Sequence, residues 1–313
     1  MLEICGKKLE SGTKLQCWLG PEGYPMPVTL IAGARPGKTL VVTAQIHGGE
    51  YAGTPAVIRL AKETDPAELS GNLVLFHLVN VSGFYSGNNA YVAEDHGNLN
   101  GCYPGSPDGT VSLRIADFFV KNIMSCADAL VDLHGGGLNE KLSPCLFYPG
   151  KDEKTMERSL RMAEATDIPN FVISRSVTGE MGYAGNVLNI PVLLLERGYG
   201  GLCLDEWVDD YVMDLKRIMA SLGICSCETG SVCEKRNFVN AVYLEAEEDG
   251  IWYPAVVLNQ KVKKGQFLGH VEDFFGKRLN EYYAEGDGEV LYFRFAKNAV
   301  KGHNLVTYGL MTK

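Results

Sequence analysis

The sequence predicts an α/β fold in which helices flank a largely parallel sheet, followed by a small all-β domain at the C-terminal end. Short apolar runs bounded by Gly or Pro, such as Leu40–Ile46 and Pro191–Leu195, are typical of strands buried on both faces of a parallel sheet. Up to Gly223 these runs alternate with helical patterns, which indicates an α/β arrangement. Beyond that residue, Gly-rich turns with β-branched and aromatic residues replace the helical periodicity.

Residues 1–36 consist of short β-like segments, and four helices are expected before the helical periodicity ends at Gly223. The expected helices cover Thr54–Thr64, Leu113–Ala127, Lys154–Thr166 and Asp205–Leu222. The last of them has a single apolar stripe and an acidic first turn, which the helix dipole favours. We therefore expect a first domain over residues 1–225, a polar linker over 226–236 and a small β domain over 237–313.

Composition excludes several classes of partner. The chain has 313 residues, of which 46% are hydrophobic and 21% charged, and this is ample material for a globular core. The net charge is -9 and Lys and Arg form no long run, so we expect no nucleic-acid or anionic-membrane partner. Because no apolar stretch is long enough to cross a membrane and no signal-peptide pattern is present, we expect a cytoplasmic protein.

The end of the first apolar run carries the most informative residues, His47 and Glu50, which are separated by two glycines. Imidazole nitrogen and carboxylate oxygen are good Zn²⁺ ligands, and a catalytic zinc site typically uses three protein groups. His134 closes the run that begins at Ala129, and the three glycines that follow it allow the backbone to pack close to a metal. The sequence therefore predicts His47, Glu50 and His134 as zinc ligands.

Glu196 ends a third apolar run and is the candidate general base for a metal-activated water. Ligands in open α/β sheets bind beyond the carboxyl ends of the strands. Strands that end at His47, His134 and Glu196 would thus bring these side chains to one rim of the sheet. This convergence of distant residues predicts a zinc-dependent hydrolase.

Four segments resemble the succinylglutamate desuccinylase and aspartoacylase family of the zinc carboxypeptidase superfamily. They are His47-Gly-Gly-Glu50, Asp95–Gly105, Asp132-Leu-His134, and Glu196 ahead of the Gly-rich turn 198–201. Their order and rough spacing match the family over nearly the whole chain. The resemblance implies a mixed, largely parallel sheet, the same three zinc ligands, Glu196 as general base and acid, and an amide or ester of a small acid or amino acid as substrate.

Two departures from the family pattern concern arginines. Gly101 stands where the family motif Asn-Leu-Asn-Arg has arginine, and Ala90 aligns with a second family arginine. A guanidinium binds a carboxylate through two parallel hydrogen bonds that neither Gly nor Ala can replace. We therefore expect a free α-carboxylate of the substrate to contribute little to binding, and the identity of the substrate stays open.

Asn100 and Arg197 are the predicted substrate-binding residues. Asn100 is retained from the family motif and can hydrogen-bond a carbonyl or carboxylate of the substrate. Arg197 directly follows the proposed base, but on a strand its side chain would point away from that of Glu196. It reaches the pocket if the strand has already ended, and otherwise forms a salt bridge under a loop.

Nine cysteines, an odd number scattered through a large chain, fit reduced thiols better than a disulfide framework. Cys225, Cys227 and Cys233 cluster where the last predicted helix ends, but their spacing is not that of a zinc finger. We interpret them as part of a linker, and their role stays open.

The C-terminal domain resembles the barrel-sandwich hairpins of lipoyl and biotinyl carriers over Val262–Gly276 and Gly286–Leu291. Lys277 does not match the modifiable lysine of such carriers, so a structural role is preferred. The domain is expected to cover the catalytic face or to make a homo-oligomer contact, and no chemistry is predicted for its residues, His303 included.

The sequence as a whole predicts a zinc hydrolase that cleaves an amide or ester bond of a small N-acyl amino acid or related metabolite. Two alternatives remain open: a zinc carboxypeptidase acting on a peptide C-terminus, and a non-catalytic binding protein on the same fold. The joint presence of three ligands and a base favours an enzyme with a small-molecule or peptide-like substrate.

Overall fold

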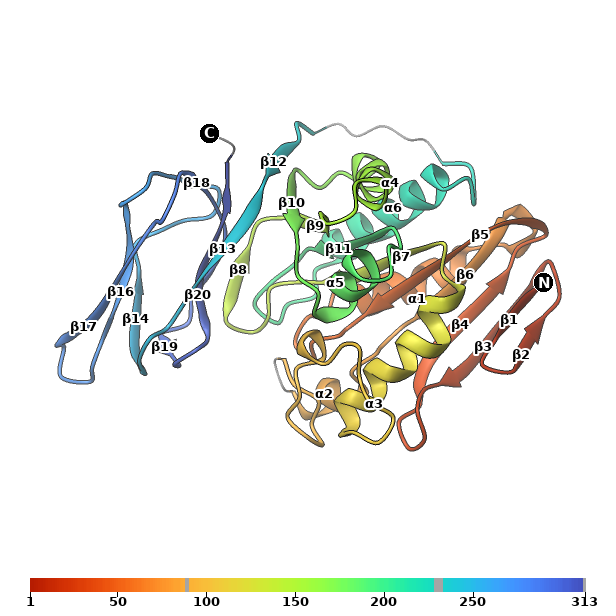
Figure 1. Cartoon of the computed structure of the whole chain (residues 1–313), viewed down its shortest axis with the longest axis horizontal. Helices are drawn as coiled ribbons and strands as arrows, with labels where there is room; N and C mark the ends of the chain where they lie inside the picture. Colours follow the sequence, from red (N-terminus) through yellow and green to blue (C-terminus); the bar gives the residue numbers. More distant parts are fainter. Residues whose placement is uncertain (88–89, 228–232, 312–313) are drawn as a thin grey trace.

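The computed structural model describes residues 1–87, 90–227 and 233–311, and within them nine strands form one large sheet (Figure 1). The strand order is β12-β10-β9-β11-β7-β5-β6-β4-β3. The strands are β3 (Thr13–Leu19), β4 (Met26–Ala32), β5 (Arg35–Ala44), β6 (Ser70–Phe76), β7 (Ala129–His134), β9 (Cys145–Pro149), β10 (Asn170–Ser174), β11 (Val192–Glu196) and β12 (Arg236–Phe238). The central strands β11, β7, β5 and β6 run parallel, whereas β9 pairs with β11, and β4 with β6 and β3, in antiparallel fashion. The predicted mixed, largely parallel sheet is confirmed.

Helices cover both faces of this sheet. The α-helices are α1 (Gly53–Glu63), α2 (Val81–Ser86), α3 (Val111–Phe118), α4 (Glu153–Glu164), α5 (Gly179–Asn186) and α6 (Asp205–Ser221). Leu40 and Val42 of β5 belong to the core shared with α1, α4 and α6, whereas Val41 belongs to the opposite core shared with α3 and α5. Both faces of the sheet are therefore buried, which explains why its strands are continuous apolar runs.

Each of the four predicted helices is present, but one is shorter than expected as an α-helix, and one further helix, α5, was not predicted. The helix expected over Leu113–Ala127 is α-helical only to Phe118, and continues as a π-helical segment and a short 3-10 turn. The sequence also gave no sign of α5, because its three glycines are weak helix formers. A Cβ at Gly185 would lie 2.6 Å from Cβ of Pro149, so glycine is required where α5 packs on β9.

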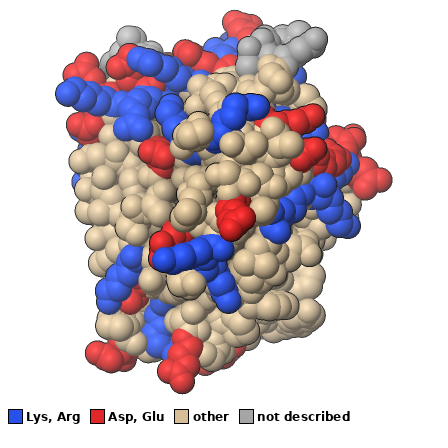
Figure 2. All heavy atoms as spheres, turned by 90° about the vertical axis from the view of Figure 1, so that its right-hand side faces the viewer, with Lys and Arg blue, Asp and Glu red and all other residues tan. Residues whose placement is uncertain are grey.

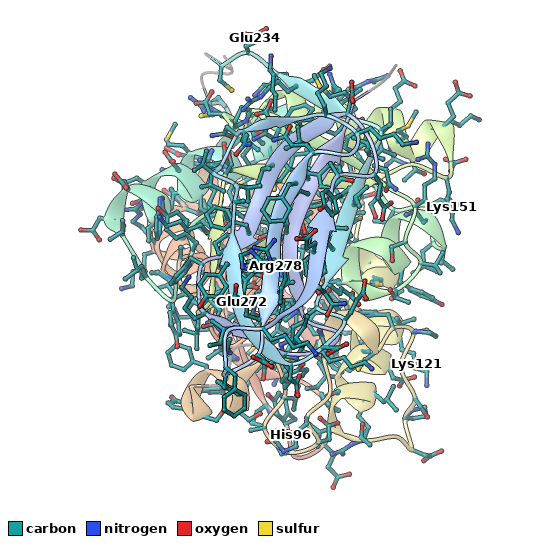
Figure 3. All side chains as sticks on the ribbon, turned by 90° about the vertical axis from the view of Figure 1, so that its left-hand side faces the viewer. His96, Lys121, Lys151, Glu234, Glu272 and Arg278 are labelled. Atoms are coloured by element: carbon teal, nitrogen blue, oxygen red, sulfur yellow. The ribbon has the colours of Figure 1, made fainter. Side chains whose placement is uncertain are left out.

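The C-terminal part is all-β, as predicted, and consists of two antiparallel sheets. One contains β13 (Asn240–Glu245), β20 (Asn304–Leu310), β18 (Gly288–Arg294) and β15 (Lys261–Val262); the other contains β17 (Arg278–Tyr283), β16 (Phe267–Glu272), β14 (Gly250–Pro254) and β19 (Asn298–Ala299). Figure 3 shows the second sheet face-on as the outer layer of the molecule, with Glu272 and Arg278 on its neighbouring strands.

Two strands join the first part of the chain to the C-terminal part. β8 (Glu140–Leu142) follows β7 in the chain but pairs with β18 of the C-terminal sheet. β12 pairs with β10, so the large sheet includes residues that the sequence assigns to the linker 226–236 and to the start of the β domain. Residues 228–232 of that linker lie outside the described residues. The pairing of β8 with β18 brings C-terminal strands close to the end of β7.

Charged side chains of both signs are interspersed on the face that carries β1 (Leu2–Ile4), β2 (Lys7–Leu9) and the edge strand β3, as Figure 2 shows. Among the described residues, no helix combines the length and the apolar character that crossing a membrane demands.

Candidate active site

The turn that follows β5 holds His47 and Glu50 at the rim of the large sheet. Gln45 has a φ of 63°, a left-handed conformation that bends the chain sharply at the strand end. Its buried side chain supports the turn, because its amide nitrogen donates to the carbonyl of Gly48 at 2.8 Å and its amide oxygen accepts from the Thr54 hydroxyl at 2.8 Å. The conformation of this turn therefore sets where the first two predicted ligands lie.

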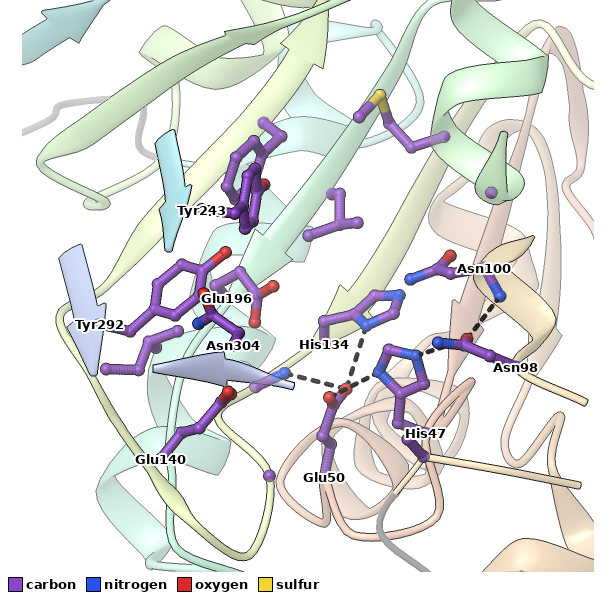
Figure 4. A pocket seen from close by; sticks show the side chains of 18 of the residues that line it. His47, Glu50, Asn98, Asn100, His134, Glu140, Glu196, Tyr243, Tyr292 and Asn304 are labelled. Carbon is purple, nitrogen blue, oxygen red and sulfur yellow. Dashed lines mark hydrogen bonds and ion pairs between the residues drawn. The ribbon is translucent and has the colours of Figure 1, made fainter. Parts of the chain in front are cut away.

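Glu50 lies between two imidazoles from different segments (Figure 4). Its Oε1 is 2.7 Å from Nδ1 of His47, and its Oε2 is 3.0 Å from Nδ1 of His134, the last residue of β7. The backbone N–H of Gly135 also donates to Oε2 at 3.2 Å. One ligand atom from each of the three side chains lies within 4.8 Å of the others, and the described residues contain no second group of this kind. The structure thus brings the three predicted ligands together.

The second nitrogen of each imidazole is held by an acceptor. Oδ1 of Asn98 receives a backbone N–H at 3.0 Å, so it acts as an acceptor toward Nε2 of His47 at 3.1 Å. Nε2 of His134 lies 2.9 Å from the buried carboxylate of Asp132, which accepts from it in the same way. Both Nδ1 atoms therefore face Glu50, and this arrangement is stable only with positive charge, from protons or a metal, between them. Zinc fits this donor set.

The charges in this cluster depend strongly on one another. Burial opposes the ionisation of Glu50, but the imidazoles of His47 and His134 outweigh it and lower the pKa of Glu50 to about 2. Burial alone would lower the pKa of His134, whereas the carboxylates of Asp132 and Glu50 raise it well above its ordinary value. The cluster therefore stabilises positive charge at its centre, as the binding of a divalent cation requires.

Glu196 ends β11 beside the ligand set. It is the register partner of His134 in the parallel pair β11–β7, so the two side chains leave the same face of the sheet. Its Oε2 is buried and has no hydrogen-bond partner among the described residues. Burial raises the pKa of Glu196 well above the usual range of a carboxylate. A carboxylate in this environment is suited to proton transfer.

Tyr211 of α6 ties the two strand ends together. Its buried hydroxyl donates to the carbonyl of His134 and accepts the backbone N–H of Arg197 at 2.7 Å. A single side chain from the last helix of the first part therefore helps to fix the position of β7 relative to β11.

The ligand set and Glu196 line a cavity of about 450 Å³ that both parts of the chain build. The C-terminal strands and their connections contribute Tyr243, Tyr292, Arg294, His303 and Asn304 to its wall. Figure 4 shows Tyr243, Tyr292 and Asn304 on the side of Glu196, opposite Asn98 and Asn100. The sequence predicts no chemistry for the C-terminal domain. No local pattern marks these residues, because long-range strand pairing, of β8 with β18 and of β12 with β10, brings them to the site.

The two positions that the family resemblance assigns to arginines, 90 and 101, carry no large side chain. Ala90 lines the cavity, and a Cβ placed on Gly101 would meet no atom within 4 Å. Asn100, predicted to bind substrate, also lies in the cavity wall. Gly101 itself is exposed beside this wall, and a side chain added there would enter open space.

The prediction that Arg197 binds substrate is corrected by the structure, because its side chain does not reach the cavity. The side chain is 5% exposed, and its Nη2 and Nη1 lie 2.8 and 2.9 Å from the carboxylates of Asp214 and Asp210 on α6. Burial would lower the pKa of Arg197, but these two carboxylates outweigh it and raise the pKa. Arg197 directly follows the last residue of β11, and its side chain packs against α6 and not in the cavity.

We expect Arg197→Ala to lower the free energy of unfolding by about 3–5 kcal/mol, because it leaves the buried Asp214 carboxylate without its partner. Urea denaturation checks the value. The double variant Arg197→Met with Asp214→Leu is the control, and it should recover most of the loss because it buries no unpaired charge. A loss below about 1 kcal/mol in the single variant would contradict the structural role.

Other residues considered in the sequence lie outside the cavity. His77 hydrogen-bonds the Thr29 hydroxyl at 2.8 Å within the sheet, and His96 is exposed. The described structure has no disulfide at any of the nine cysteines. The thiols of Cys225 and Cys233 donate to backbone carbonyls at 3.7 and 3.3 Å.

Glu180 of α5 is a buried carboxylate near the site that the sequence does not single out. It is fully buried, and neither carboxylate oxygen has a hydrogen-bond partner among the described residues. Burial, and then the negative charge of Asp132, raise its pKa well above the usual range. No sequence signal identifies it, because the glycine-rich helix that carries it was not predicted.

Comparison with known proteins gives matches over the first part and over the whole chain. The model of the succinylglutamate desuccinylase/aspartoacylase catalytic domain matches residues 36–218. The chain is 26% identical over 289 residues to the N-alpha-acetyl-L-2,4-diaminobutyric acid deacetylase of Halomonas elongata, and the match covers 90% of this chain and 84% of that protein.

Solved structures resemble the fold over nearly its full length. The product-bound structure of the ectoine utilization protein EutE (DoeB) from Ruegeria pomeroyi matches with a TM-score of 0.85 and 25% identity, over 97% of this chain and 98% of that chain. A succinylglutamate desuccinylase/aspartoacylase structure from Rhodobacter sphaeroides matches with a TM-score of 0.86 and 21% identity, over 99% of each chain. The second match supports the fold alone.

Proposed function

Because the chain is a metallohydrolase that belongs to the succinylglutamate desuccinylase/aspartoacylase family, we propose that it hydrolyses the amide bond of a small N-acyl amino acid. The observation that carries this proposal is the presence, in one cavity, of the His-Glu-His set and a buried carboxylate oxygen of Glu196 without a described partner. The products would be a carboxylic acid and a free amino acid.

In this proposal His47, Glu50 and His134 hold a zinc ion, through the two Nδ1 atoms and the carboxylate that face one another. Asn98 and Asp132 keep both imidazoles in the required orientation by accepting from their Nε2 atoms. A zinc ion bound here supplies a Lewis acid that polarises the scissile carbonyl and lowers the pKa of water toward about 7.

Glu196 accepts the proton of the attacking water and returns it to the leaving nitrogen. Three observations support this role: its side chain leaves the sheet beside His134, its Oε2 is buried without a partner, and burial raises its pKa. A carboxylate with a raised pKa is a stronger base than an exposed one.

The cavity suits a small metabolite, since about 450 Å³ lies in the usual range of small-molecule sites. The substrate in the name of the Halomonas elongata relative, N-alpha-acetyl-L-2,4-diaminobutyric acid, is therefore the first candidate. Asn100 lines the cavity, which supports a role in hydrogen-bonding a carbonyl or carboxylate of such a substrate. We also propose a cytoplasmic location, which the nine cysteines without a disulfide support.

The test uses the purified, zinc-loaded protein and a panel of N-acyl amino acids, with a peptide and a simple ester for comparison. We expect release of the acyl group from at least one N-acyl amino acid. Stoichiometric zinc without turnover of any of these compounds would contradict the proposal, and rapid release of a C-terminal amino acid from the peptide would favour the carboxypeptidase alternative.

A further prediction follows from Gly101 and Ala90. Peptides with a free C-terminal carboxylate and their amides should be hydrolysed at similar rates, because no arginine is present at either position to bind the carboxylate. Gly101→Arg should then raise kcat/KM for substrates with a free carboxylate by about 10-fold, since the side chain enters open space. Gly101→Gln is the uncharged control. A large preference for free carboxylates in the parent protein would show that another residue binds them.

A further inference from the structure

Glu140 begins β8, the strand that joins the first part of the chain to the C-terminal sheet. It lines the same cavity as the ligand set and Glu196, and Figure 4 shows its side chain directed toward the interior of the cavity. Neither the metal ligands nor the proton transfer of the proposed mechanism requires this third carboxylate. Its position in the wall leaves it accessible to a ligand in the cavity.

The obvious protein partner of Glu140 is Arg294, its register partner across β8 and β18. No ion pair joins the two among the described residues within 4.0 Å. The Arg294 guanidinium instead donates from Nε to the carbonyl of Asn304 at 3.2 Å and from Nη1 to Oδ1 of Asn298 at 3.3 Å. Arg294 is therefore directed mainly to β19 and to the first residue of β20, and it neutralises Glu140 only from a distance.

The Asn304 side chain lies beside the Glu140 carboxylate. Its Oδ1 accepts from the Thr307 hydroxyl at 3.2 Å, which turns its amide nitrogen toward the cavity. That nitrogen is buried, has no close hydrogen bond among the described residues, and acts on the Glu140 carboxylate by favouring its ionised form. Burial raises the pKa of Glu140, and a cation beside it would favour the ionised form. The cavity wall thus offers a carboxylate acceptor that no cation in the described part of the chain neutralises at close range, with the Asn304 amide beside it.

The charges of the cavity residues also favour a cationic group on the ligand. The family arginines are replaced by Gly101 and Ala90, while Glu140 adds a negative charge that no described residue pairs with at close range. Both features disfavour an extra anionic group on the substrate and favour a cationic one. An ammonium group provides three donors for an acceptor of this kind.

We propose that Glu140 binds an ammonium group of the substrate and makes the protein selective for N-acyl derivatives of basic amino acids over neutral ones of the same size. The inference rests on the proposed amide hydrolysis and names its substrate class. Charge-assisted hydrogen bonds of this type typically contribute about 1.5–3 kcal/mol, which corresponds to about 10- to 100-fold in kcat/KM.

The test compares N-acetyl-2,4-diaminobutyrate with N-acetyl-2-aminobutyrate, which lacks only the side-chain amino group. In the zinc-loaded parent protein, kcat/KM should favour the first compound by about 10- to 100-fold. Glu140→Gln should remove most of this preference and leave kcat/KM for the neutral compound within about 3-fold of the parent value. An unchanged ratio, or an equal fall for both compounds, would overturn the proposal, because a structural role affects both alike.

Lys141→Gln is the matched control, since Lys141 is the next residue of β8 and its side chain is exposed. It should leave the ratio unchanged. If the parent hydrolyses neither compound, the inference is tested on binding alone, and the proposed function is judged on the wider panel of N-acyl amino acids. Calorimetry with zinc-loaded protein should then show tighter binding of 2,4-diaminobutyrate than of 2-aminobutyrate in the parent and not in Glu140→Gln; equal binding in the parent overturns it.

Discussion

Glu196→Gln should lower turnover by at least about 10²- to 10⁴-fold and leave zinc content and thermal stability close to those of the parent protein. The amide keeps the size and hydrogen-bonding shape of the carboxylate but cannot accept the proton of water. Because Oε2 of Glu196 has no hydrogen-bond partner in the described structure, the substitution breaks no bond at that atom. The loss should therefore appear in kcat and not in folding, measured on a substrate that the parent hydrolyses.

The matched control for this change is Glu206→Gln, which makes the same chemical substitution on the exposed first turn of α6. It should retain parent turnover. Near-normal turnover of Glu196→Gln would rule out the proposed role in proton transfer. A parallel loss of zinc would instead show that Glu196 is needed to assemble the metal site.

Removal of the metal should have an effect of similar size. A chelator, or the variant His47→Ala, should reduce turnover by on the order of 10³-fold or more, because the zinc supplies several kcal/mol of transition-state stabilisation. His47 is preferred over His134 for this test, since its side chain is 16% exposed whereas that of His134 is 2% exposed and packed in the sheet. Metal analysis and turnover are measured on the same sample.

Addition of zinc should restore activity to the chelated parent and not to His47→Ala. His96→Asn is the control, since His96 is exposed and asparagine tolerates its φ of 54°. Stoichiometric zinc in both His47→Ala and His134→Ala would mean that the ion is held elsewhere.

The centre of the site follows from the sequence because its residues are defined by local features. His47, Glu50, His134 and Glu196 each follow or end a buried apolar run, and neighbouring parallel strands bring their carboxyl ends to one rim. The sheet itself is equally predictable, because burial on both faces imposes continuous apolar runs. Helical patterns between these runs predicted the four long helices, but not the change to a π-helical segment after Phe118.

The surroundings of the site depend on contacts between distant residues. Arg197 binds Asp210 and Asp214 on α6, so a side chain predicted to bind substrate is directed under a helix. Glu180 lies on α5, a helix that the sequence did not predict because its glycines are weak helix formers. At Gly185 glycine is required, since α5 packs closely on β9 there.

Glu140 and Asn304 show most clearly which features follow from the sequence and which depend on the tertiary structure. The sequence by itself determined the sheet, the ligand set and the position of Glu196, since strand periodicity and the residue at each strand end are local properties. Only the tertiary structure decided the far wall of the cavity, where β8 pairs with β18 and brings Tyr292 and Arg294 beside residues more than a hundred positions earlier in the chain. The physical reason is that strand pairing depends on long-range backbone hydrogen bonds and packing, which leave no periodic signal in either segment.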